Sequence, residues 1–220
     1  MTASLHYLYD PLCGWCYGAA PGLRALTKAE GLPPLTLHPT GLFAGRGARP
    51  MDRHFAAYAW SNDQRIAALT GQIFSEAYRS GPLASFDRPF DSTAATRALT
   101  AVHRVAPARE AEALAAIQSA RFVDGRDVTD PAVLADILSA LGLGEAAGFA
   151  ADPTLDALVE RRAAEGRALL AEARGNGVPT LALRTAEGLT ALSSEPLYRN
   201  PESLFSTLRR IADGAVLSSL

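Results

Sequence analysis

The chain has two cysteines, Cys13 and Cys16, and both lie in the segment YLYDPLCGWCYGAAP. A Cys-x-x-Cys pair is typical of a redox couple, of half a metal site, or of two small buried side chains. A structural zinc site needs four ligands, and the chain has no second cysteine pair and no histidines at ligand spacing. We therefore expect no metal site and favour the redox couple, with metal binding and a purely apolar role kept as alternatives.

The residues around the pair predict a strand that leads into a helix. Residues 5–9 (LHYLY) form an apolar and aromatic run that Asp10-Pro11 ends, which indicates a buried strand followed by a turn. After the cysteines, apolar residues recur at helical spacing up to Gly31, and residues 35–39 (LTLHP) alternate like a second strand. The cysteines thus open the helix of a strand–helix–strand unit, whose two strands run parallel.

A helix start favours the ionised form of the first cysteine. Unsatisfied backbone N–H groups and the positive end of the helix dipole point toward it, and the thiolate is the nucleophile in thiol–disulfide exchange. We therefore expect Cys13 to attack a substrate disulfide. Cys16, one turn further along and more buried, would resolve the resulting mixed disulfide.

The rest of the chain predicts a helical insertion and a closing hairpin. Residues 50–175 carry apolar residues three and four apart with almost no strand signal, and Asp130-Pro131 and Asp152-Pro153 are each typical of an N-cap before a helix. Residues 181–184 and 189–193 flank a turn, and Asn200-Pro201 precedes a last helix expected to end near Gly214. We assign residues 1–49 and 176–220 to one α/β domain and residues 50–175 to an inserted helical domain.

Length and composition exclude several classes of protein. The chain has 220 residues, 48% of them apolar, and a formal net charge of −2, so it can bury a substantial core without disulfide staples. Its scattered basic residues lack the patch that nucleic acid requires. It has no signal-like N-terminus and no apolar run long enough to span a membrane. We expect a cytoplasmic protein with neither nucleic acid nor membrane as a partner, while the oligomeric state is left open.

Three motifs together resemble the DsbA-like form of the thioredoxin fold: LCGWCYGAAP after the first strand, FVDGRDVTDPAVL in the insertion, and GVPT before the closing hairpin. The resemblance covers the whole chain and is strongest to bacterial cytoplasmic DsbA-family oxidoreductases, including the FrnE-like group. It extends to hydroxychromene-carboxylate isomerases and kappa-class glutathione transferases. It implies an α/β thioredoxin-like fold, βαβ and then ββα, with a large inserted helical domain.

The resemblance also implies roles for individual residues. Pro179 matches the family's cis-proline, which faces the two cysteines, and Val178 would offer its backbone to an extended substrate. Gly14 and Trp15 would tune the stability of the thiolate and hence the redox potential, and Trp15 would cover one side of the site. Pro21 resembles the proline that kinks the active-site helix. No cofactor is implied, with glutathione as a candidate co-substrate.

The chain departs from the family pattern in front of the cysteines. Tyr7 stands six residues before Cys13, where thioredoxin and DsbA carry a buried acid, so proton handling is expected to differ. Asp10 is nearer and is a candidate to serve in place of that acid, but an Asp-Pro pair usually marks a solvated turn, which is the role we expect. Arg121 and Arg162 are expected to be polar groups at the surface.

These observations predict a thiol-disulfide oxidoreductase of the DsbA family, acting as a disulfide reductase, oxidase or isomerase on protein or small-thiol substrates. A second hypothesis is a glutathione-dependent isomerase or transferase on the same fold, in which turnover survives the loss of Cys16. A third is a peptide-holding chaperone in which the dithiol is incidental. The two residues between the cysteines do not determine the redox direction, because related motifs differ widely in potential.

Overall fold

A central sheet organises the computed structural model, which describes residues 3–212. Its four strands are β1 (Ser4–Tyr9), β2 (Leu35–Pro39), β5 (Thr180–Thr185) and β6 (Gly188–Leu192), in the order β2-β1-β5-β6. Strand β2 runs parallel to β1, whereas β5 is antiparallel to β1 and β6 is antiparallel to β5. The predicted parallel unit and closing hairpin are both confirmed.

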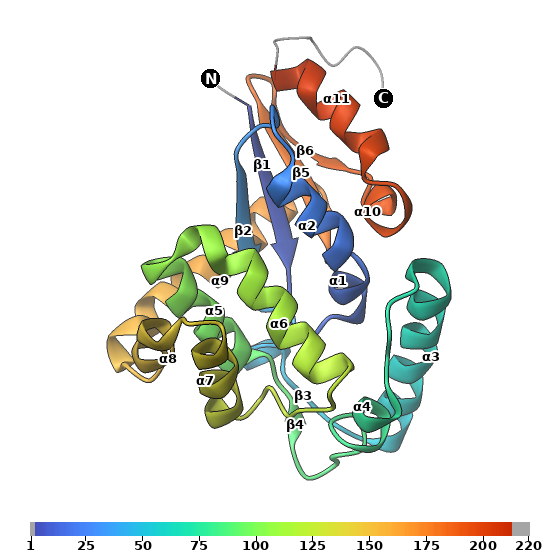
Figure 1. The fold of residues 1–220 in the computed structure, drawn as a ribbon, viewed down its shortest axis with the longest axis vertical. Helices are drawn as coiled ribbons and strands as arrows, with labels where there is room; N and C mark the ends of the chain where they lie inside the picture. The colour runs from blue at the N-terminus through green and yellow to red at the C-terminus, as the bar shows by residue number, and fades with distance from the viewer. Residues whose placement is uncertain (1–2, 213–220) are drawn as a thin grey trace.

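The dithiol helix is broken in two, as Pro21 predicted. α1 (Gly14–Gly18) ends before Ala19, and α2 (Ala20–Lys28) begins with Pro21 in its first turn. Proline is tolerated at that point because the first N–H groups of a helix have no partner within the helix. α1 is therefore a short, separate helix that has Cys13 as its N-cap and contains Cys16, and α2 follows it in the same region of the molecule (Figure 1).

Helices cover both faces of the sheet. Side chains alternate between the two faces of a strand, and Tyr7 and Tyr9 of β1 join the cluster that contains Leu23 of α2. Leu8 points the other way, into a second cluster with Leu169 of α9 (Asp156–Glu172). The chain then closes with α10 (Glu195–Arg199), which packs against α2, and α11 (Glu202–Ala212).

The insertion is helical, with one short strand pair that the sequence did not indicate. β3 (Arg49–Pro50) and β4 (Pro89–Phe90) form a two-residue antiparallel ladder at its base. Its helices are α3 (Arg53–Thr70), α4 (Glu76–Ser80), α5 (Thr93–Val105), α6 (Glu110–Phe122), α7 (Pro131–Ala140) and α8 (Gly144–Ala150). Single 3-10 turns lie at Gly45–Gly47, Pro107–Arg109 and Pro153–Leu155. α3 stands next to α1, on the opposite side of the molecule from α7 and α8 (Figure 1).

Both predicted Asp-Pro helix starts are confirmed. Asp130 accepts a hydrogen bond from Ala132 N at 2.8 Å and caps α7. Asp152 accepts one from Thr154 N at 2.8 Å, and α9 follows after the single 3-10 turn. The last helix begins just after Asn200-Pro201, while its expected end near Gly214 lies outside the described residues.

A buried ion pair joins the insertion to the sheet. Glu110 of α6 accepts hydrogen bonds from the Tyr9 hydroxyl at 2.9 Å and from Arg162 Nη2 at 2.8 and 3.0 Å. His103 Nδ1 lies 2.7 Å from the same carboxylate, and Arg162 also donates to the carbonyl of Leu37 at 2.9 Å. The prediction that Arg162 lies at the surface is wrong, because Arg162 is buried. Its partner Glu110 is 52 residues away in the sequence, so the residues next to Arg162 do not indicate this burial.

Arg121 was also expected at the surface and is buried. Its guanidinium lies over the rings of Tyr78, Phe90 and Phe122, 5.2–5.8 Å from their centroids. The aromatic faces supply the attraction that burial of the cation requires.

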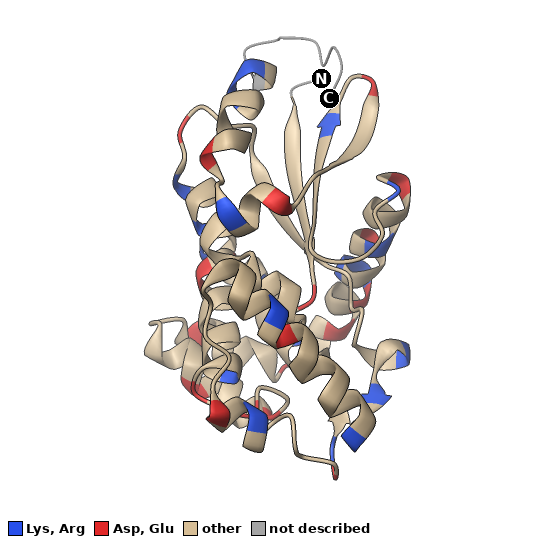
Figure 2. Cartoon of the chain, turned by 90° about the vertical axis from the view of Figure 1, so that its right-hand side faces the viewer, with Lys and Arg blue, Asp and Glu red and all other residues tan. Residues whose placement is uncertain are grey.

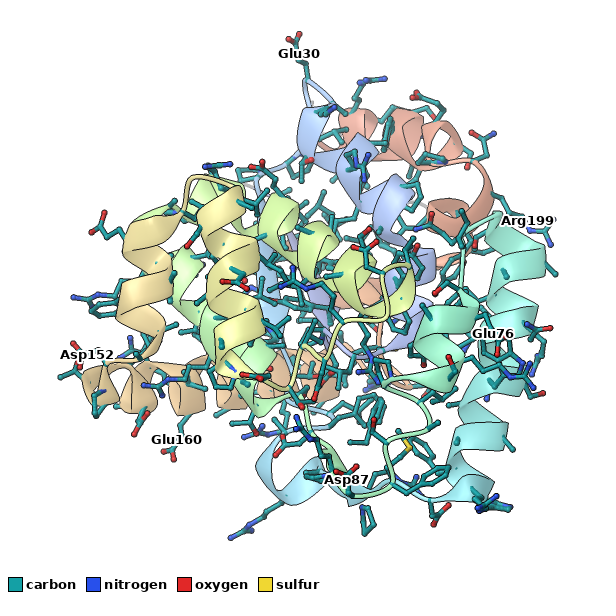
Figure 3. All side chains as sticks on the ribbon, turned by 60° about the horizontal axis from the view of Figure 1, so that its bottom comes forward. Glu30, Glu76, Asp87, Asp152, Glu160 and Arg199 are labelled. Carbon is teal, nitrogen blue, oxygen red and sulfur yellow. The ribbon has the colours of Figure 1, made fainter. Side chains whose placement is uncertain are left out.

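The outer surface mixes charges of both signs. Lys and Arg alternate with Asp and Glu over the helices in Figure 2, and the side chains labelled in Figure 3, such as Glu30, Glu160 and Arg199, project from the periphery. Across residues 3–212, no helix has the length and apolar character needed to cross a membrane.

Candidate active site

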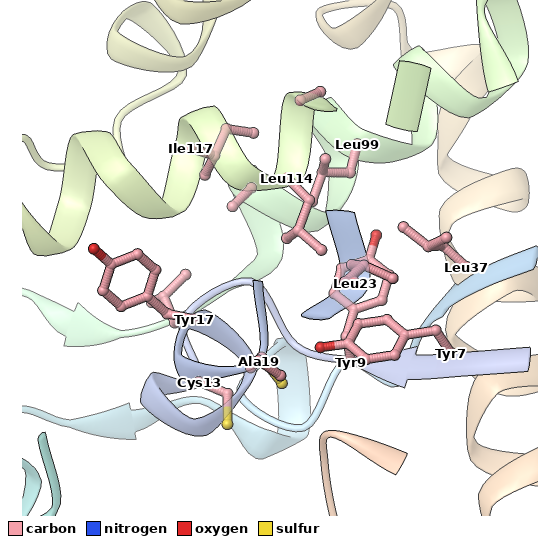
Figure 4. Packing of buried hydrophobic residues seen from close by; sticks show 14 of the residues in the cluster. Tyr7, Tyr9, Cys13, Tyr17, Ala19, Leu23, Leu37, Leu99, Leu114 and Ile117 are labelled. Carbon is pink, nitrogen blue, oxygen red and sulfur yellow. The ribbon is translucent and has the colours of Figure 1, made fainter. Parts of the chain in front are cut away.

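The two cysteines differ in how much solvent they meet. Cys13 is the N-cap of α1, with extended backbone angles (φ −76°, ψ 119°), and is 8% exposed, whereas Cys16 is 1% exposed. They are not joined by a disulfide. Figure 4 shows Cys13 at the edge of the apolar cluster, with its sulfur directed away from Leu114 and Ile117. Cys13 is therefore the sulfur that a substrate meets first.

The loop before β5 faces Cys13. The Val178–Pro179 peptide bond is cis, as the family resemblance implied. The thiol of Cys13 donates to the carbonyl oxygen of Val178 at 3.6 Å, across 165 residues of sequence. Two hydroxyls hold this loop in place: Thr180 donates to the carbonyl of Gly177 at 2.6 Å, and Ser194 donates to that of Pro179 at 3.2 Å.

Cys16 lies in surroundings that favour the neutral thiol. Burial raises the pKa of Cys16 well above its ordinary value, and the neighbouring Cys13 raises it further. Tyr7 is also fully buried, its hydroxyl has no hydrogen-bond partner, and its pKa is raised by burial and then by the nearby Cys16. Tyr7 therefore stays protonated and does not replace the acid that relatives carry at this position.

One side of the dithiol is covered by two aromatic residues. Trp15, half-buried, packs edge-on against Tyr198 of α10, with ring centroids 5.6 Å apart. Burial raises the pKa of the Tyr198 hydroxyl, and the charges of Cys16 and Cys13 raise it further. The family resemblance implied that Trp15 covers the site, but nothing in the sequence indicated Tyr198, because α10 is a five-residue helix without a clear pattern.

Helix α3 also packs on the dithiol helix and approaches α1 at its two glycines. A Cβ on Gly14 would lie 2.3 Å from Asp63 Oδ1, and one on Gly18 would lie 2.6 Å from Ile66 Cγ2. Real Cβ atoms do not approach other atoms this closely, so only glycine permits this packing at both positions. Gly14, predicted as a residue that tunes the dithiol, is thus a point of close contact between the dithiol helix and α3 of the insertion.

Asp63 provides the α3 side of the contact at Gly14, and it is 4% exposed. Its Oδ2 accepts a hydrogen bond from the Tyr78 hydroxyl at 3.0 Å. Burial raises the pKa of Asp63 to about 7, while the Tyr78 hydroxyl and then Arg121 act to lower it. Sequence reasoning missed Asp63, although an acid on the face of α3 that carries Phe55 and Ile66 was a signal that the residue is buried.

Asp10 was expected in a solvated turn and is fully buried, which corrects that prediction. Its two oxygens accept from Leu12 N at 3.0 Å, Phe43 N at 3.0 Å and Ser92 Oγ at 2.8 Å. Burial raises the pKa of Asp10, and the three donors partly oppose that rise. The carboxylate thus ties the loop before Cys13 to two segments far along the chain, which the dipeptide alone does not reveal.

No cluster of three or more His, Cys, Asp or Glu side chains suited to a metal ion occurs among residues 3–212. The arrangement supports the chemistry of two sulfurs, of which the outer one, Cys13 Sγ, faces the backbone carbonyl of Val178.

Comparison with known proteins identifies the family. The model of the DSBA-like thioredoxin domain matches residues 5–194. The chain belongs to this family. A cytosolic disulfide reductase, DsbM from Pseudomonas aeruginosa, is 34% identical, with 96% of this chain and all of that chain covered and a TM-score of 0.84. The same protein with GSH gives 34% identity, coverage of 94% and 99%, and a TM-score of 0.82.

A more distant structure supports the DSBA-like fold alone. It is a putative protein disulfide isomerase from Nitrosomonas europaea, 20% identical over 94% of this chain and 98% of that one, with a TM-score of 0.75. Among curated proteins, none matches the chain. Family and fold together make the chain a DsbA-like thiol-disulfide oxidoreductase.

Proposed function

We propose that the chain carries out dithiol–disulfide exchange through Cys13 and Cys16. The Cys13 thiolate attacks one sulfur of a substrate disulfide, forms a mixed disulfide and expels the other half as a thiolate, which takes up a proton. Cys16 then loses its proton and attacks Cys13 Sγ, which forms the Cys13–Cys16 disulfide and releases the second substrate thiol. Two electrons pass from the dithiol to the substrate.

The observation that carries this proposal is the contrast between the two sulfurs. Cys13 is the more accessible and lies against the carbonyl of Val178, where an extended substrate would meet both the sulfur and the backbone. Cys16 is buried, and its raised pKa keeps it a thiol until the mixed disulfide forms. This order suits a nucleophilic first cysteine and a resolving second one.

The reducing direction and the partners are proposed by extension from a similar protein. DsbM is described as a cytosolic disulfide reductase, and one of its structures contains GSH. We extend both properties to this chain: a cytoplasmic reductase of protein or small-thiol disulfides. Glutathione would serve as the co-substrate, two molecules reducing the Cys13–Cys16 disulfide to the dithiol with release of one oxidised glutathione.

Substitution of each cysteine tests the assignment. Cys13→Ser is expected to lower the reduction of a model protein disulfide to the uncatalysed rate, because no other nucleophilic sulfur reaches the substrate. Cys16→Ser is expected to accumulate a mixed disulfide on Cys13, visible as an added mass that a reductant removes. Equal activity of Cys13→Ser and the parent protein would contradict the proposal.

The same variants separate the other hypotheses. A glutathione-dependent isomerase or transferase would keep its turnover in Cys16→Ser and would bind glutathione saturably near Cys13. A peptide-holding chaperone would suppress aggregation of an unfolded client equally well before and after both cysteines are alkylated.

A further inference from the structure

The exchange steps above leave unused two buried acids near the dithiol. The charge of Asp10, whose carboxylate accepts from three donors, adds to the rise in the pKa of Cys16 that burial and Cys13 cause, and Asp63 lies against the dithiol helix. Asp63 Oδ1 lies 2.3 Å from the position that a Cβ of Gly14 would take, and Gly14 directly follows Cys13. The other oxygen is fixed by the Tyr78 hydroxyl at 3.0 Å. The carboxyl group is therefore held with one oxygen toward the backbone between the two cysteines.

The ionisable groups around Asp63 come from four helices. They are the dithiol on α1, Tyr78 on α4, Arg121 on α6, and Tyr198 on α10, which packs against α3 and α2 beside the cysteines. Arg65, two residues along α3, is exposed. Arg121 is the cation that acts on the Asp63 carboxylate, and it is buried among aromatic rings. The atoms nearest the Cβ position of Gly14 are those of Asp63 and Ile66, so within residues 3–212 no cation lies closer to Gly14 than the Asp63 carboxyl group.

We propose that Asp63 is a positioning residue that sets the reducing direction of this dithiol: when ionised, its negative charge beside Gly14 disfavours the thiolate of the reduced pair. This inference rests on the proposed exchange chemistry and adds the group that determines its direction. A dithiol whose reduced form is less stabilised passes its electrons on more readily, as the contrast between oxidising and reducing members of the superfamily shows. In thioredoxin and DsbA the buried acid stands at the position that Tyr7 of β1 takes here, whereas Asp63 comes from α3 of the helical insertion.

The physical basis is Coulomb repulsion in a poorly hydrated place. Two negative charges held close together repel more strongly when water is excluded. Burial raises the pKa of Asp63 to about 7, so the charge is present above neutral pH and absent below it. Because coupling between two sites is reciprocal, formation of the Cys13–Cys16 disulfide is also expected to ease the ionisation of Asp63.

Asp63→Asn removes the charge and keeps the shape of the side chain. At pH 8, we expect the equilibrium constant for oxidation of the dithiol by oxidised glutathione to fall by about three- to tenfold. Alkylation of Cys13 by iodoacetamide, located by peptide mass, is expected to be faster than in the parent protein at the same pH. The inflection near neutral pH in the alkylation rate is expected to disappear.

Tyr78→Phe is the second variant, and it leaves Asp63 in place. Loss of the hydroxyl removes the donor that favours the carboxylate, so Asp63 ionises at higher pH than in the parent. We expect this variant to resemble Asp63→Asn at pH 7 and to converge on the parent at alkaline pH. Gln64→Ala, on the exposed side of the same helix, is the control and is expected to match the parent throughout.

The outcomes separate this inference from the function on which it rests. If the parent protein fails to exchange with glutathione or with a protein disulfide, the proposed function fails. If the parent exchanges, and folded Asp63→Asn and Tyr78→Phe both keep the parent's equilibrium constant and pH profile, the inference is overturned while the function stands. A shift in Asp63→Asn that Gln64→Ala reproduces would also overturn it.

Discussion

Asp63 shows, at the scale of one residue, how burial makes stability depend on pH. Its pKa rises from an ordinary value of about 3.9 to about 7 in the folded chain. Because the folded value is the higher one, the folded state binds the proton more tightly than the unfolded chain. The stabilisation is complete below the unfolded pKa and is lost as pH rises through about 7.

We therefore predict that the unfolding free energy of the parent protein falls between pH 5 and pH 8 relative to that of Asp63→Asn, which cannot ionise. Urea unfolding of the two proteins at intervals across this range measures the difference. If the unfolding free energies of the two proteins change in parallel with pH, the folded structure does not hold the Asp63 carboxyl in the neutral form.

At the scale of elements, glycines decide how closely helices approach their neighbours. Gly166 of α9 interrupts an apolar face in the sequence, yet it is the residue that lets α9 meet the end of β2. A Cβ there would lie 2.3 Å from the carbonyl oxygen of Pro39, which is backbone and cannot turn aside. Gly14 and Gly18 serve the same purpose between α1 and α3.

We predict that Gly166→Ala destabilises the fold by about 1–3 kcal/mol, the cost of forcing an extra methyl into a packed contact. Gly148→Ala in α8 is the matched control, since no atom lies within 4 Å of its added Cβ. The control is expected to gain about 1 kcal/mol from the better helix propensity of alanine. Thermal melts of both variants measure the effect, and equal melting temperatures would contradict the packing argument.

At the scale of the whole molecule, the insertion and the sheet form one structure. The Glu110 carboxylate of α6 binds Tyr9 of β1 and Arg162 of α9, and α3 rests on the dithiol helix. The active site is assembled from both parts, because Val178 comes from the sheet region and Asp63 from the insertion. The domain boundaries at residues 50 and 175 stay predictions about sequence organisation.

We predict a single unfolding transition, in which the calorimetric and van't Hoff enthalpies agree. Glu110→Ala is expected to lower the stability of the whole molecule by about 3–5 kcal/mol, since it leaves the buried Arg162 without its partner. Replacing both residues with apolar ones, Glu110→Leu with Arg162→Met, is expected to recover much of that loss. Two separate transitions in the parent protein would show that the parts unfold independently.

Features that depend only on neighbouring residues could be predicted from the amino-acid sequence. The apolar run before Cys13, the Asp-Pro helix starts at Asp130 and Asp152, and the closing hairpin are local signals, because each depends on backbone preferences within a few residues. The cis peptide bond at Pro179 was predicted through family resemblance, since an X-Pro bond is usually trans.

Which polar residues are buried could be learned only from the folded molecule. Charged residue types are usually found at the surface, and three of them are buried here: Asp10, Arg121 and Arg162. Their burial depends on partners that lie tens of residues away along the chain. Asp63 meets the dithiol only because α3 folds back onto Gly14. Burial of a charged group is favourable only where its partners are already assembled, and that condition belongs to the folded molecule and not to any short stretch of sequence.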